Sequence, residues 1–222
     1  MASIEHGHIK ANPFVSVKLA AAPVRERFLT IEEAKALIAA IDATMTPPFA
    51  EATKLLLFTG ARKTEILGLR WTEIDFERRQ LRLPPERTKA GGKTGERHIV
   101  LPPPATAILR SRATARMKAS RKELSEFVFP GSRGVSHLTG LRRPFIRACA
   151  AAGLSDVRIH DLRHSFASLA VANGASLFLV GKLLGHASTR TTERYAHLSS
   201  DPLHEAADLV AGTLVHGEHD HV

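Results

Sequence analysis

Apolar side chains recur at helical spacing along much of the chain. The clearest case lies between residues 159 and 173, where apolar residues fall at i, i+4, i+7 and i+8: Leu162, Phe166, Leu169 and Ala170. Side chains at this spacing line one side of a helix, so this stripe is predicted to be buried. A different face of the same helix is cationic and carries His160, Arg163 and His164.

Capping and breaking signals predict five further helices. Thr30, followed three residues later by Glu33, forms a capping box ahead of an apolar run that extends to Ile41. Prolines open two more helices, at residues 47–48 and 102–104, because proline is tolerated in a first helical turn. The other two are predicted over residues 138–152 and 177–184. Glycines end two of the five, Gly60 after the second helix and Gly185 after the last.

The period changes between Trp71 and Leu101. Three pairs of apolar residues alternate there with polar ones: Ile74 and Phe76, Leu81 and Leu83, Ile99 and Leu101. Alternation of this kind predicts three short antiparallel strands. A polar turn rich in glycine and cations, residues 84–97, separates the last two strands. The fold class expected is mainly α with a small three-stranded antiparallel β-sheet (α+β).

The net charge of the chain indicates a class of binding partner. The chain has 222 residues, with 31 Lys and Arg against 22 Asp and Glu, a net charge of +9. The last 22 residues hold five of the acids and no Lys or Arg, so residues 1–200 carry +14. Such a surplus points to a polyanion, most often nucleic acid, because binding releases counterions. The cations of the helix after residues 102–104 are expected to form a solvated face, with phosphate contact as the alternative: Arg110, Arg112, Arg116, Lys118, Arg121 and Lys122.

The length and the remaining composition limit the number of hydrophobic cores, the disulfide bonds and the cellular compartment. A chain of this size is expected to form one hydrophobic core. The single Cys149 excludes an internal disulfide, and its alanine-rich helical setting predicts a small core residue. No apolar run reaches membrane-spanning length and the N-terminus has no signal-peptide pattern, so a cytoplasmic protein is expected.

Two residues further along the chain could act chemically together with the cationic face of residues 159–173. His186 follows the helix end at Gly185, and Tyr195, the only tyrosine, comes nine residues later. Guanidinium groups bind phosphate oxygens, imidazoles shuttle protons, and a phenol is a nucleophile once its proton is removed, so a phosphodiester suits the set. In the alternative interpretation His160 satisfies a core position, Arg163 is solvated and Tyr195 packs at an interface. Spacing alone leaves both interpretations open.

The exact residues of these motifs resemble those of a known protein family. His160-Asp161-Leu162-Arg163-His164, then Leu183-Leu184-Gly185-His186, then Tyr195 closely resemble the C-terminal motifs of the tyrosine recombinase (phage integrase) family. The resemblance implies the tyrosine recombinase catalytic-domain fold. It also implies an early arginine, and Ala61-Arg62-Lys63-Thr64-Glu65 matches that motif. Arg62 would then bind the scissile phosphate, and Glu65 would support the site by packing or pairing.

The family further implies a catalytic lysine in the β-hairpin. Thr88-Lys89-Ala90-Gly91 aligns best with the family pattern, so Lys89 is the first choice and Lys93 the second. The loop is longer and richer in glycine than the family pattern leads one to expect. Contacts with DNA are expected from five further cations: Lys93, Arg97, Arg142, Arg143 and Arg147.

The resemblance also divides the chain. Residues 1–27 are expected to be a linker or the remnant of an absent N-terminal DNA-clamping domain, in a chain that is either an excised fragment or naturally short. Residues 28–200 are expected to form the catalytic domain, and residues 201–222 a C-terminal helix and an acidic, histidine-containing tail. That helix carries an apolar stripe, which either packs on its own domain or docks on a neighbouring protomer. The histidine spacing of the tail fits no standard zinc site, and no metal is expected.

The chemistry implied is site-specific cleavage and rejoining of double-stranded DNA through a 3′-phosphotyrosyl intermediate, with no cofactor. Tyr195 is the expected nucleophile, and Arg62 and Arg163 neutralise the phosphate oxygens. His160 is the expected proton acceptor, because a free phenol has a pKa near 10. Lys89 would protonate the leaving 5′-oxygen, and His186 would donate to the phosphate or orient the tyrosine.

Two other functions remain open at this level. A type IB topoisomerase has a similar constellation but rejoins the same strand, and a non-catalytic DNA-binding regulator would keep only the fold. The short length and the Leu-Leu-Gly-His wording favour the recombinase over the topoisomerase. The six catalytic positions are all occupied by competent residues, which argues against the regulator. The isolated domain is expected to be a monomer, and the full-length protein to act as a homotetramer on DNA.

Overall fold

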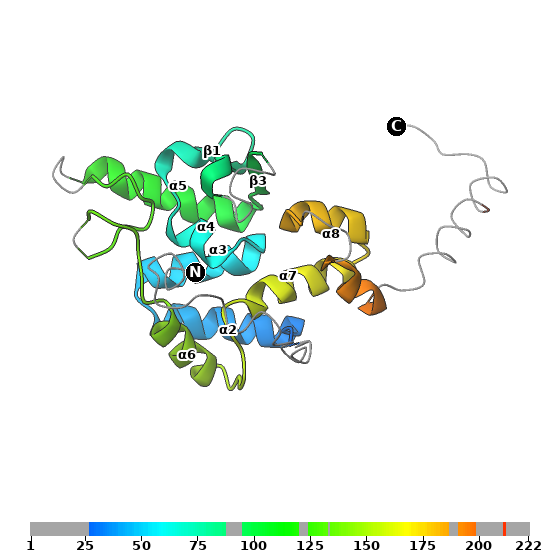
Figure 1. Ribbon diagram of the computed structural model, residues 1–222. Helices are drawn as coiled ribbons and strands as arrows, with labels where there is room; N and C mark the ends of the chain where they lie inside the picture. The colour runs from blue at the N-terminus through cyan, green and yellow to red at the C-terminus, as the bar shows by residue number, and fades with distance from the viewer. Residues whose placement is uncertain are drawn as a thin grey trace, which may run out of the picture.

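A computed structural model describes residues 27–87, 95–119, 124–132, 134–186, 191–198 and 211. This part of the chain is mostly helical, with one small antiparallel sheet (Figure 1), so the fold class predicted from the sequence is confirmed. Lys89, Lys93, the N-terminal linker and nearly all of residues 201–222 lie outside the described residues. None of the described helices is long and apolar enough to cross a membrane.

The predicted helix signals act where the sequence places them. Helix α2 (Ile31–Thr44) begins with the capping box, in which the Thr30 hydroxyl accepts from the Glu33 amide and the Glu33 carboxylate accepts from the Thr30 amide. Helix α3 (Pro47–Thr59) starts with its prolines and ends at Gly60, which has a left-handed φ of 61°. The main core forms between the apolar faces of these two helices, α5 (Pro103–Lys118) and α6 (Arg142–Ala151). Cys149 is buried in it, as predicted.

The sheet consists of β1 (Ile74–Asp75), β2 (Gln80–Leu83) and β3 (Arg97–Val100) in the order β1-β2-β3. Its register pairs Leu81 with Ile99 and Leu83 with Arg97. Side chains alternate across a strand, so the inward face of β3 holds both Ile99 and Arg97. The sheet therefore directs one guanidinium group into the body of the protein.

A second, smaller cluster joins the C-terminal elements. Helix α7 (Asp161–Ala172) packs against α3, α8 (Leu177–Leu184) and the 3₁₀ segment η5 (Glu193–Leu198). Helix α8 ends at Gly185, whose φ is 63°. The buried members of this cluster are Ala167, Val171, Val180, Leu184 and Tyr195. Packing of η5 on α7 thus fixes the segment that carries the tyrosine.

Two details differ from the sequence predictions. Helix α6 begins at Arg142, four residues later than predicted. On α5 the predicted solvated face is wrong for two of its arginines. Arg112 donates to the Val128 carbonyl oxygen at 3.0 Å and forms an ion pair with Glu51, and the Arg116 guanidinium lies 5.3 Å from the centre of the Trp71 ring. Long arginine side chains cover apolar surface while their charged ends reach polar partners, so a run of charges does not by itself define a solvated face.

Candidate active site

Arg62 is the N-cap residue of the short helix α4 (Lys63–Leu67), two residues after the break at Gly60. Glu65, three residues on, accepts from the Arg62 backbone amide at 2.7 Å and from its Nη1 at 2.8 Å. Glu65 is only 2% exposed, whereas the Arg62 side chain is 26% exposed. One buried carboxylate therefore holds Arg62 by its backbone and its side chain together, with part of the guanidinium open to solvent.

Arg97 reaches the same carboxylate from the sheet. Its Nε lies 3.1 Å from Glu65 Oε1, and its Nη1 donates to the Leu184 carbonyl oxygen at the end of α8. The residue is 7% exposed, and within the described part of the chain its Nη2 has no hydrogen-bond partner. Burial lowers the pKa of Arg97, with the Glu65 charge opposing that shift. Arg97 was predicted to contact DNA, and it lies inside the protein, in the same cluster as Arg62 and Arg163.

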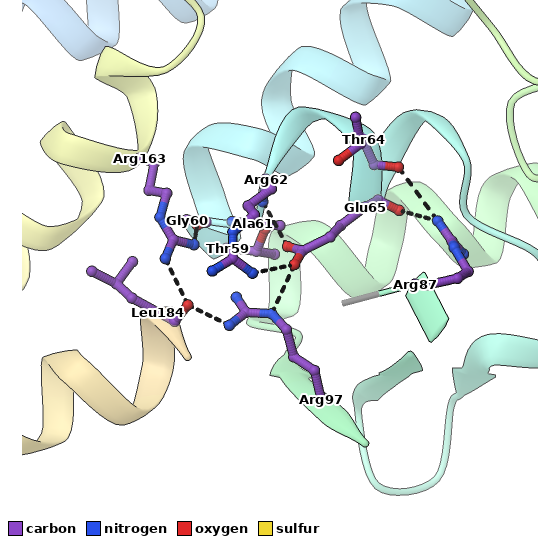
Figure 2. Close-up of polar contacts among 10 residues, drawn as sticks. All are labelled: Thr59, Gly60, Ala61, Arg62, Thr64, Glu65, Arg87, Arg97, Arg163 and Leu184. Atoms are coloured by element: carbon purple, nitrogen blue, oxygen red, sulfur yellow. Dashed lines mark hydrogen bonds and ion pairs between the residues drawn. The ribbon is translucent and has the colours of Figure 1, made fainter. Parts of the chain in front are cut away.

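Arg163 comes from the first turn of α7 and is 5% exposed. It donates through Nη1 to the Gly60 carbonyl oxygen and through Nη2 to the Leu184 carbonyl oxygen, each at 2.7 Å. Both acceptors lie at helix C-termini, where carbonyls are free and the helix dipole favours a cation. Burial, followed by the charges of Arg97 and Arg62, lowers the pKa of Arg163 to about 10. Figure 2 shows the three arginines converging from α4, β3 and α7.

The charges in this cluster do not balance. Three guanidinium groups meet here with one carboxylate: Arg62 and Arg97 form ion pairs with Glu65, whereas Arg163 donates to two backbone carbonyl oxygens (Figure 2). Buried charge is costly unless it is paired, so an arrangement with surplus positive charge favours an anionic ligand. Arginine presents five N–H donors in a planar fork that fits phosphate oxygens. The cluster can therefore bind a tetrahedral oxyanion.

His186 follows Gly185 at the edge of this cluster. Its Nδ1 lies 2.9 Å from the Thr192 hydroxyl, which fixes the ring between α8 and the segment leading to η5. The pKa of His186 is lowered from its ordinary 6.5 to about 4, first by burial and then by the charge of Arg163, with smaller effects from other arginines. The imidazole is thus neutral at pH 7.

Tyr195 is 5% exposed, and its hydroxyl oxygen lies 2.6 Å from Nδ1 of His164. Burial raises the pKa of Tyr195, while the charges of Arg194 and Arg163 act in the opposite direction. The ring of His160, the N-cap residue of α7 one turn before His164, meets the His164 ring edge to face, with centroids 4.8 Å apart. The pKa of His160 is lowered too, first by desolvation and then by the Arg163 charge.

His164 is a site residue to which the sequence pattern assigned no role. His160 was the expected proton acceptor, and the imidazole in contact with the hydroxyl is that of His164. The one available signal was the shared face of α7, because residues four apart on a helix lie on the same side. The sequence held no information on where Tyr195 would meet that face.

Three further predicted site residues lie away from this cluster. Arg142, Arg143 and Arg147 are exposed on α6, which packs on α2 and lies apart from α8 in Figure 1. The two candidate lysines, Lys89 and Lys93, lie outside the described residues. Across the described ranges, no group of three or more His, Cys, Asp or Glu side chains is placed to hold a metal ion.

Comparisons with known proteins identify sequence relatives of this chain. The sequence model of the phage integrase family matches residues 27–201. The integrase of Salmonella phage P22 is 29% identical over 206 residues, covering 86% of this chain and 49% of that protein. Tyrosine recombinase XerC of Oceanobacillus iheyensis is 34% identical over 212 residues, covering 90% of this chain and 66% of that protein. The chain thus spans about half to two thirds of the length of these relatives.

Solved structures are similar as well. The crystal structure of XerA recombinase matches with a TM-score of 0.65 at 24% identity, covering 90% of this chain and 68% of that one. XerH site-specific recombinase, bound to palindromic difH substrate in a post-cleavage complex, matches with a TM-score of 0.66 at 26% identity. That match covers 84% of this chain and 54% of the XerH chain.

Proposed function

The chain belongs to the phage integrase family, and from that premise we propose that it cleaves and rejoins double-stranded DNA at specific sites. The reaction runs through a covalent 3′-phosphotyrosyl intermediate formed by Tyr195. The observation that carries this proposal is the cluster of three arginines with one carboxylate, in which Glu65 pairs with Arg62 and Arg97 while Arg163 is held by backbone carbonyl oxygens. The only tyrosine of the chain packs on the same helix as Arg163.

Each described side chain has a role that its position supports; Lys89 lies outside the described residues and keeps the role that the family implies. The hydroxyl oxygen of Tyr195 attacks the phosphorus, and the bond to the 5′-oxygen breaks. Arg62 and Arg163 bind the non-bridging oxygens and stabilise the charge that builds up in the transition state. Arg163 uses two N–H groups on backbone carbonyls, which leaves others of its five donors for phosphate. His186 donates to the phosphate, His160 lies beside the tyrosine's partner, and Lys89 protonates the leaving oxygen.

The phosphotyrosyl bond keeps the energy of the phosphodiester, so rejoining needs no nucleotide cofactor. Attack by a 5′-hydroxyl from another site gives recombination, and attack by the original one restores the substrate. We propose that this domain, residues 28–200, is monomeric alone and works as a tetramer on DNA in a longer protein, in the cytoplasm. Because the charge of +14 on residues 1–200 drives binding through counterion release, its affinity for DNA decreases steeply with salt.

Covalent capture tests this function. The protein and its Tyr195→Phe variant are incubated with a pool of nicked suicide duplexes, from which the cleaved end diffuses away, and adducts are resolved on a denaturing gel. An adduct with the wild type and none with the variant is expected. An adduct that persists in Tyr195→Phe contradicts the assignment of the nucleophile. Strand exchange between two captured sites, rather than plasmid relaxation alone, then separates a recombinase from a topoisomerase.

A further inference from the structure

The hydroxyl of Tyr195 has one polar side chain in contact with it among the described residues, the imidazole of His164. Their 2.6 Å separation joins η5 to α7 across the smaller core cluster. We propose that His164 is the base that takes the proton of Tyr195 as it attacks the phosphate and returns it when the DNA is rejoined. This inference rests on the proposed cleavage reaction and names a catalytic residue for it.

The direction of the hydrogen bond follows from the two groups. A neutral imidazole has one N–H and one lone pair, and its Nδ1 lone pair is a better acceptor than a phenolic oxygen. The phenolic O–H, with a pKa near 10, is the more acidic donor of the two. We therefore assign the tautomer with the proton on Nε2, so that Tyr195 donates to Nδ1 of His164. The proton already points along its transfer path.

The other two histidines of the site, His186 and His160, are less suitably placed to take the proton of Tyr195. Nδ1 of His186 is occupied by the Thr192 hydroxyl at 2.9 Å. The ring of His160 contacts the ring of His164, one turn away on α7. General-base catalysis requires hydrogen-bond reach to the proton that is abstracted, and His164 meets this requirement in the protein without DNA.

The charges around His164 explain why the proton stays on the phenol until DNA arrives. From α7, His160 and Arg163 disfavour an imidazolium at position 164, while Asp161 favours it; from η5, Arg194 disfavours it. Burial, the largest cause, and the charges of His160, Arg194 and Arg163 together lower the pKa of His164 to about 4, against the opposing charge of Asp161. A phosphate bound at the arginine cluster adds negative charge beside these groups and makes His164 more basic. Substrate binding thereby activates the nucleophile.

The proposed step is balanced in atoms and charge. A bond forms between the Tyr195 oxygen and phosphorus while the bond from phosphorus to the 5′-oxygen breaks. The phenolic proton moves to Nδ1 of His164, and the 5′-oxygen takes a proton from Lys89. In the reverse direction the 5′-hydroxyl attacks, its proton returns to the lysine, and the imidazolium of His164 protonates the departing tyrosine.

The hydrogen bond can be tested without DNA, because Tyr195 is the only tyrosine. Its ionisation is followed by tyrosinate absorbance in the wild type, His164→Ala and His164→Asn. Loss of the acceptor removes an interaction that favours the protonated phenol, so the midpoint in His164→Ala is expected to fall by about one pH unit. Asn retains an acceptor close to the Nδ1 position, so its midpoint stays nearer to the wild type. A midpoint unmoved in His164→Ala overturns the proposal whether or not the protein cleaves DNA.

The catalytic step is tested by the rate of covalent adduct formation on the nicked duplex pool. His164→Asn is expected to slow cleavage by about 10²–10⁴-fold with DNA affinity unchanged, and imidazole in the buffer is expected to restore His164→Ala. His160→Asn is the matched control, since it removes an imidazole one turn away and leaves the tyrosine's partner in place; its loss is not rescued by imidazole. Cleavage by His164→Asn within threefold of the wild type at all pH values overturns the proposal. If the wild type forms no adduct, the proposed function fails, and the tyrosinate titration alone decides whether the hydrogen bond exists.

Discussion

Gly185 illustrates how one backbone position holds the site together. Its left-handed φ of 63° ends α8 and leaves the Leu184 carbonyl free for Arg97 and Arg163. A Cβ at position 185 would lie 1.5 Å from Nη1 of Arg97. The position therefore requires glycine twice, for the backbone conformation and for the space that the guanidinium occupies.

A matched pair of substitutions separates these two requirements. Gly153→Ala introduces a side chain at a φ of 69° with no neighbour within 4 Å, so it is expected to cost about 1–2 kcal/mol from the left-handed backbone alone. Gly185→Ala has the same backbone cost and must also displace Arg97, which adds about 1–3 kcal/mol. Urea unfolding of both variants measures the difference. Equal losses of stability would show that Arg97 is not held against Gly185.

At the scale of elements, the five-residue helix α4 is important because it sets the position of Arg62. A helix of this length is not stable alone, because nucleation is unfavourable. Side chains fix both of its ends: Glu65 binds Arg62 and Arg97 at the start, and Arg87, paired with Glu73, donates to the Glu65 carbonyl oxygen at 3.2 Å towards the end. The position of Arg62 thus depends on contacts from β3 and from the segment after β2.

Removing the shared carboxylate is expected to destabilise the protein strongly. Glu65→Gln leaves Arg97 buried without a charged partner, which costs about 3–5 kcal/mol. The double variant with Arg97→Met removes the buried charge as well and is expected to recover more than half of that loss. Glu126→Gln, which breaks the exposed pair of Arg70 and Glu126, is the control and costs less than about 1 kcal/mol.

Denaturant unfolding of the four proteins in one buffer measures these effects. A loss of less than about 1 kcal/mol in Glu65→Gln would indicate that water or another group takes over the charge of Arg97. A double variant no more stable than Glu65→Gln would show that packing, rather than the unpaired charge, accounts for the cost.

For the whole molecule, the burial of two histidines in the site has a thermodynamic consequence. His164 and His186 each have a pKa lowered from 6.5 to about 4, chiefly by burial. A group whose pKa is lower in the folded state binds protons more readily when the chain is unfolded. Its contribution to stability is complete above pH 6.5 and is lost as the pH falls towards 4.

The free energy of unfolding is therefore expected to decrease between pH 6.5 and 4, by on the order of 2 kcal/mol for each of these two histidines. Denaturant titrations across this range measure the slope. Carboxylates titrate in the same window, so the difference between the wild type and the double variant His164→Asn, His186→Asn isolates the histidines. Parallel curves for the two proteins would mean that the imidazoles are solvated in the folded state.

The sequence by itself determined the elements and the family. Capping boxes, first-turn prolines and glycine ends act over three or four residues, so the start of α2 and both ends of α3 and α8 were predicted almost to the residue. The alternation of Arg97 with Ile99 even contained the information that Arg97 points inward, although its charge favoured a role on the surface. The motifs at Arg62, Arg163 and Tyr195 likewise indicated phosphodiester chemistry through their resemblance to the tyrosine recombinase family, because the spacing alone left a structural interpretation open.

Only the tertiary structure decided which of these groups meet. Residues 60, 65, 97, 163 and 184 belong to five different segments, and no local pattern encodes the distances between them. The packing of η5 on α7 decided that the hydroxyl of Tyr195 contacts His164 rather than His160, because a difference of one helical turn is fixed by how two elements dock. Local periodicity specifies the face of a helix, whereas the partner of that face depends on the packing of the whole core.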